Sequence, residues 1–185
     1  MILPSEHLHW LYAAAFLMVG LCLLASAIAG DDVWNRRALR TYSWAGLGFI
    51  MGVLLWPAVV IPMGSTSDLI AHAVWAQTTL LAGAAYLAIA RRKLRSAYWR
   101  LAMPLALGAG AAAFFAHLQN GWMYSRASFV HHVCAWTLLV GALFAVAQTL
   151  RPQSPVARTG VALAFVVLAV ALFSTRDEAP VFGPR

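Results

Sequence analysis

Charged residues are scarce in this chain. Asp, Glu, Lys and Arg together make up 10% of its 185 residues, whereas hydrophobic residues make up 62%. The apolar residues form several runs long enough to cross a hydrocarbon core of about 30 Å. We therefore expect an integral membrane protein in contact with a lipid bilayer, with no sequence left over for a soluble domain.

Several chemical motifs are also missing. The chain has only two cysteines, Cys22 and Cys134, and no CxxC pair, which disfavours a disulfide framework or a thiolate cluster. It has no nucleophile–base pair, no phosphate-binding glycine loop and no paired intramembrane carboxylates. Hydrolase, kinase and carboxylate-driven proton-pump functions are therefore disfavoured, and the sequence leaves open whether the protein is an enzyme.

Hydropathy predicts six membrane spans, at 10–30, 43–63, 69–90, 101–118, 129–149 and 157–174. Backbone groups in lipid must pair internally, and runs of this length are helices rather than barrel strands. The predicted fold class is all-α: a single transmembrane domain over 1–185, built as a bundle of six transmembrane helices. Glu6 and two histidines precede the first run where a signal peptide would carry Lys or Arg, so we expect this helix to be retained.

The basic residues predict the orientation. Ten of the thirteen fall on one side of the predicted bundle, and cytoplasmic loops carry the excess of Lys and Arg. These ten are Arg36, Arg37, Arg40, Arg91, Arg92, Lys93, Arg95, Arg100, Arg151 and Arg158. Both termini are then outside, and a bacterial inner membrane is the expected location. Because topology explains the net charge of +7, no nucleic-acid partner is expected.

All six histidines fall near the predicted outer face. They are His7, His9, His72, His117, His131 and His132. Ionisable side chains in a membrane are costly and usually functional, and imidazole is a common ligand of iron, copper and zinc. The sequence therefore predicts a metal or haem site at this face.

A weak internal repeat relates 43–92 to 101–151. Each half contains an outer histidine, a tryptophan about one turn later and a Thr-Leu-Leu-x-Gly-Ala segment. This arrangement places His72 and His131 at matching depth, about one turn below the interface. Gly108 and Gly110 provide a small-residue surface for close helix packing or for a flat macrocycle.

Neighbouring histidines are expected to diverge. His7 and His9 are two residues apart and point to different sides of a helix, so one of them could reach the site while the other faces water. At most one of the adjacent His131 and His132 is expected to point into a given site.

The stretch 107–151 resembles a half-repeat of the haem A synthase family. The resemblance rests on Leu107-Gly108-Ala109-Gly110, on Phe129-Val130-His131-His132 and on the apolar helix that ends at Arg151. It implies a single bundle of similar architecture that holds a haem between His72 and His131. For a b-type haem with both axial positions filled by these histidines, we expect one-electron transfer between a membrane quinol and an outer redox partner. The family has a His-Arg pair where this chain has His131-His132, so haem A synthesis itself is not implied.

Two alternatives remain open. The histidine cluster also resembles that of CopD-type copper-resistance membrane proteins, which implies copper as the cofactor, and Met63 and Met123 lie on the same predicted side. The other alternative is a cofactor-free accessory subunit of a larger respiratory or oxygenase complex. The haem hypothesis predicts that replacing His72 or His131, but not His7 or His9, abolishes haem retention.

Overall fold

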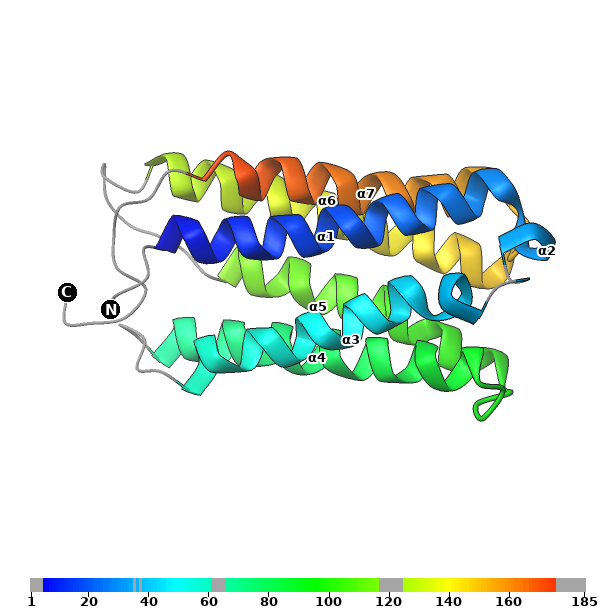
Figure 1. The fold of residues 1–185 in the computed structure, drawn as a ribbon. Coiled ribbons are helices and arrows are strands. Elements are labelled where there is room, and N and C mark those ends of the chain that lie inside the picture. Colours follow the sequence, from blue (N-terminus) through cyan, green and yellow to red (C-terminus); the bar gives the residue numbers. More distant parts are fainter. Residues whose placement is uncertain (1–4, 35, 37, 61–65, 117–124, 176–185) are drawn as a thin grey trace.

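The computed structural model describes residues 5–34, 36, 38–60, 66–116 and 125–175, and no strand occurs among them (Figure 1). The elements in chain order are α1 (Ser5–Ala29), α2 (Asp31–Trp34), α3 (Ala38–Val60), α4 (Thr66–Ala90), the 3-10 helix η1 (Ala97–Leu101), α5 (Ala102–Ala116), α6 (Ser125–Leu150) and α7 (Pro155–Phe173). The predicted all-α fold is confirmed.

A helix lies at each of the six predicted spans, and five are confirmed as long and apolar enough to cross a membrane. These five segments are His9–Ala29, Leu69–Ala90, Ala97–Ala116, Ser128–Leu150 and Pro155–Phe173. The remaining long helix, α3, corresponds to the predicted span 43–63, whose last residues lie outside the described part of the chain. The short helices α2 and η1 were not predicted.

Local sequence signals set several of the helix ends. At the end of α1, Gly30 adopts φ +77°, a backbone conformation that glycine tolerates without steric cost. At the start of α7, the Ser154 side chain accepts a hydrogen bond from the Ala157 amide, and Pro155 occupies the first turn, where no helical N–H partner is needed.

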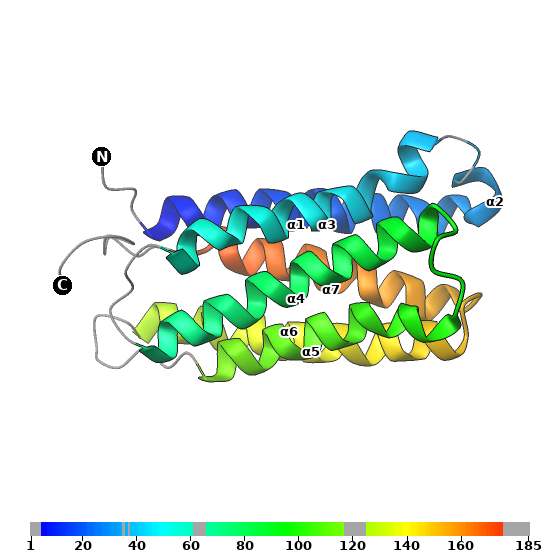
Figure 2. The ribbon, with the colours of Figure 1, turned by 90° about the horizontal axis from the view of Figure 1, so that it is seen from below.

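The six long helices run side by side along a common direction (Figures 1 and 2), and their contacts close into a ring. Each helix packs against the next one along the chain, and α7 packs against α1 to close the ring. Consecutive helices are antiparallel, so α1, α4 and α6 begin at the end of the bundle where α3, α5 and α7 finish. Helices that begin at this end therefore alternate around the ring with helices that return to it.

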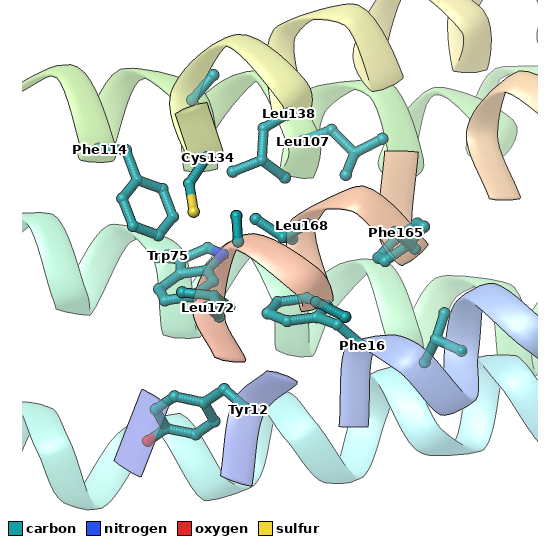
Figure 3. Packing of buried hydrophobic residues seen from close by; sticks show 14 of the residues in the cluster. Tyr12, Phe16, Trp75, Leu107, Phe114, Cys134, Leu138, Phe165, Leu168 and Leu172 are labelled. Atoms are coloured by element: carbon teal, nitrogen blue, oxygen red, sulfur yellow. The ribbon is translucent and has the colours of Figure 1, made fainter. Parts of the chain in front are cut away.

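Aromatic rings fill the middle of the bundle (Figure 3). Trp75 of α4 is only 8% exposed; its ring stacks on Phe16 of α1 at 5.7 Å between centroids and meets the edge of Phe114 of α5 at 5.0 Å. The Tyr12 ring meets the Trp75 ring edge-on, with 6.3 Å between the ring centroids. In a membrane, where lipid is as apolar as the protein interior, such van der Waals packing is a main source of helix association. Trp75 thus ties three helices together.

The interface between α3 and α4 is built on glycine, a signal that the sequence analysis missed. Gly48 and Gly52 form a GxxxG pair on α3. A Cβ on Gly52 would lie 2.5 Å from the Cα of Leu80, and one on Gly83 would lie 2.6 Å from the Cα of Phe49. The backbones of α3 and α4 therefore touch, which only glycine permits.

The outer surface of the bundle is apolar. Ile28, Leu105, Phe129 and Leu143 are each more than 60% exposed, and they belong to three different helices, α1, α5 and α6. Apolar exposure on this scale is far beyond that of a soluble monomer and fits contact with lipid. The structure thus agrees with a bilayer environment.

Candidate histidine site

Five of the six histidines lie in helices that begin at the same end of the bundle. His7 and His9 are in the first turns of α1, His72 is in α4, and His131 and His132 are in α6. His72 and His131 are each the seventh residue of their helix, about 9 Å from its start. Each histidine lies farther from the start of its helix than the three or four residues predicted, because both helices begin before the apolar run, at the polar residues Thr66 and Ser125.

The structure separates the adjacent histidines of α6. His131 is buried, with 5% of its surface exposed, and its ring lies 5.3 Å from that of Phe114. His132 is exposed, and its Nδ1 donates a hydrogen bond to the Ser128 carbonyl at 2.8 Å. Consecutive residues on a helix differ by about 100° in direction, so only His131 points to the interior.

The histidines of α1 are separated in the same way. His9 is half-buried, and its ring centroid lies 6.1 Å from that of His131. His7 is exposed and packs against Trp10 at 5.2 Å. One member of this pair was expected to reach the site, and in the structure the member that lies near His131 is His9.

His9, His72 and His131 line one cavity of about 30 Å³. The other lining residues are Ala71, Trp75, Ala113 and Phe114. The three histidines come from α1, α4 and α6, which are alternate members of the helix ring and all begin at this end. The fold thus brings histidines from three alternate helices to the lining of one cavity.

The small-residue surface predicted for a macrocycle is occupied by protein at Gly110 but not at Gly108. A Cβ on Gly110 would lie 3.3 Å from both Leu138 and the Trp75 ring, so this glycine serves close packing. A Cβ on Gly108 would meet nothing within 4 Å. The Trp75 and Phe114 rings fill the space next to His72 and His131.

A haem therefore does not fit the residues as they are packed. Sites for ligands of that size have volumes of roughly 300–1,000 Å³, whereas a water-sized particle needs only about 10–15 Å³. The cavity of about 30 Å³ has room for a single ion or water. Haem binding at this place would require Trp75 and Phe114 to leave the core.

The spacing of the imidazoles suits a shared ion only in part. Two imidazoles that bind one ion at metal–nitrogen distances of about 2.0–2.1 Å have ring centres roughly 5–6 Å apart. The 6.1 Å between His9 and His131 is close to that range. Among the described residues, however, no three His, Cys, Asp or Glu side chains are placed to hold a metal ion together. A three-ligand site would need the three side chains to move closer together.

Three residues singled out in the sequence lie outside the described part of the chain. His117 directly follows the last residue of α5, Ala116, and lies outside the described residues, as do Met63 and Met123. The roles assigned to them stay predictions.

Comparison of the chain with family models, with curated proteins and with solved structures finds no match.

Proposed function

We propose that this chain is a membrane protein that binds a copper ion through His9 and His131, with His72 as a third ligand. By the positive-inside rule, the site faces away from the cytoplasm, at the outer surface of a bacterial inner membrane. The observation that carries the proposal is the convergence of three histidines from alternate helices on one small cavity.

Copper is favoured over haem by size and over harder ions by ligand chemistry. The cavity accommodates an ion and not a porphyrin. Imidazole binds copper, zinc, iron and nickel, and soft thiolate and thioether groups select copper(I), zinc and iron–sulfur clusters over harder ions. Cys134 is buried one turn below His131 in the same aromatic cluster as Trp75 (Figure 3), and Met51 and Met103 line the next cavity along the axis. The surroundings of the site are thus soft as well as nitrogen-rich.

We propose binding rather than transport through the bundle. Beyond the aromatic core, the axis opens at the opposite end into a cavity lined by Arg92, Arg100 and Arg158, with no acidic side chain among its described lining residues. Guanidinium groups repel a cation that would leave by this route. Storage of copper, or its delivery to an outer partner, is therefore the better fit.

The proposal is tested by measuring metal binding with two matched pairs of variants. The purified protein in detergent is stripped with a chelator, loaded with copper or zinc and analysed for metal content and affinity. We expect one copper per chain. His131→Ala should weaken binding by more than about a hundred-fold, because even partners that only orient a ligand are worth about 10- to 100-fold. His132→Ala, one residue away and exposed, should bind as the unmodified protein does.

His9→Ala and His7→Ala form the second pair, with loss expected only for His9→Ala. An optical spectrum of the protein before stripping separates the remaining hypotheses. A sharp α band that disappears in His72→Ala or His131→Ala would show that the cofactor is haem b and not copper. It would also support electron transfer from a quinol. Absence of both metal and haem, with unchanged folding of all four variants, would leave a cofactor-free subunit of a larger membrane complex.

A further inference from the structure

The end of the bundle opposite the histidines contains a much larger cavity, of about 690 Å³. This end lies on the right in Figure 1, where α2 and the connections from α4 to α5 and from α6 to α7 are found. The lining residues come from every long helix except α5, and from α2, η1 and the turns. Its volume is within the range of roughly 300–1,000 Å³ that is typical of ligand sites.

The charge of this basic-end cavity has one sign. Arg92, Arg100 and Arg158 line it, and none of its described lining residues is Asp or Glu. Guanidinium groups bind phosphate and carboxylate through paired, charge-assisted hydrogen bonds. The cavity therefore favours an anion.

The floor of the cavity is apolar. It is formed by Leu23, Ala45 and Val161, which lie farther into the bundle than the arginines of the mouth, and the Trp44 ring forms part of the wall. Trp44 and Ala45 also line the apolar cavity in the middle of the bundle. A ligand that fills this space has a charged group at the mouth and an apolar part below it.

The walls are held in place without a ligand. Tyr86 donates a hydrogen bond from its hydroxyl to the carbonyl of Arg100 at 2.9 Å, and its ring meets the edge of Trp44 at 4.7 Å between centroids. Trp34 donates from Nε1 to the Arg40 carbonyl at 2.9 Å. Walls fixed in this way reduce the entropy lost when a ligand binds.

We propose that the basic-end cavity binds the phosphate group of an anionic membrane lipid. Phosphate supplies the anion that the arginines require, and the acyl or glycerol part of the lipid fits the apolar floor. Basic pockets between helices on the cytoplasmic side of membrane proteins commonly bind such headgroups. The proposal is independent of the metal site, because the two sites share no lining residue.

The test measures lipid binding in neutral detergent by the shift of the thermal unfolding midpoint during titration with phosphatidylglycerol or phosphatidylcholine. The informative variants are Arg100→Gln and Arg92→Asn. Both side chains are exposed, and asparagine tolerates the φ of 57° that Arg92 adopts. Arg151→Gln is the matched control, because Arg151 is an exposed arginine at the same end that does not line the cavity. Arg158 is left intact, because its Nη2 donates to the Ser26 carbonyl at 3.1 Å and joins α7 to α1.

We expect phosphatidylglycerol to bind and phosphatidylcholine not to bind. Removal of one arginine should weaken phosphatidylglycerol binding about five-fold, and removal of both about 25-fold. These values follow from the binding free energy that one basic side chain contributes near an anionic membrane surface. Arg151→Gln should have no effect. Equal binding of the two lipids, or equal binding by the double variant and the control, would overturn the proposal. Titration with inorganic phosphate and glycerol phosphate identifies the source of the phosphate: if these bind as tightly as the lipid, a soluble phosphate is the ligand and the lipid assignment is overturned.

Discussion

Trp75→Ala is expected to lower the free energy of unfolding by about 3–5 kcal/mol, the range found when a large buried aromatic side chain is truncated. The Trp75 ring contacts Phe16, Phe114 and Tyr12 from two other helices, and it also fills the space in front of Gly110. Its removal leaves a void that joins the histidine cavity to the apolar cavity below, because Trp75 lines both.

The measurement is reversible unfolding in mixed micelles by titration with a denaturing detergent, followed by helical circular dichroism. Trp136→Ala is the control. Trp136 occupies the corresponding place in the sequence repeat, but it is 58% exposed and its one described ring contact is with Phe115 at 5.3 Å. A change within about 0.5 kcal/mol is expected for it, as for most surface substitutions. Equal losses for the two tryptophans would contradict the central position of Trp75.

Gly83→Ala is expected to lower the free energy of unfolding by about 2 kcal/mol, within the range for overpacked sites. The new Cβ would lie 2.6 Å from the Cα of Phe49 and 2.9 Å from the carbonyl carbon of Gly48. These are backbone atoms, so no side-chain rotation relieves the overlap and α3 must move away from α4. The same unfolding assay measures the effect, and spin labels on the two helices report their separation.

Gly108→Ala provides the comparison for this effect. Gly108 lies inside α5, and a Cβ there would meet nothing within 4 Å. Alanine in a helix interior is favoured over glycine by about 0.5–1 kcal/mol, so a small gain in stability is expected. A loss at Gly108 as large as that at Gly83 would show that the α3–α4 contact does not control the result.

The position of the helices could be predicted from the sequence because the physics of a membrane span is local. A long apolar run in lipid can pair its backbone groups only within itself, and it becomes a helix whatever its neighbours are. The helix ends were predicted less well. The helices α4 and α6 begin at Thr66 and Ser125, before the predicted 69 and 129, because helical hydrogen bonding continues into polar residues beyond the apolar run.

The sequence could predict only the depth of the site along the bundle. The repeat correctly gave His72 and His131 the same depth, because depth follows from counting residues along helices of known direction. It could not show that Trp75 is buried whereas Trp136 is exposed, although the two occupy matching places in the repeat. Position within the ring of helices decides this difference.

The amino-acid sequence by itself determined an all-helical membrane bundle with histidines gathered toward one end and arginines toward the other. Only the tertiary structure decided that His9 and His131, and not His7 and His132, line the same cavity, and that the arginines at the other end surround a much larger one. The reason is that the sequence does not fix how each helix is rotated about its own axis. The apolar pattern of these helices fixes where each begins and ends, but the rotation of each helix about its own axis is set by contacts with its neighbours, such as Trp75 against Gly110 and Gly83 against Phe49.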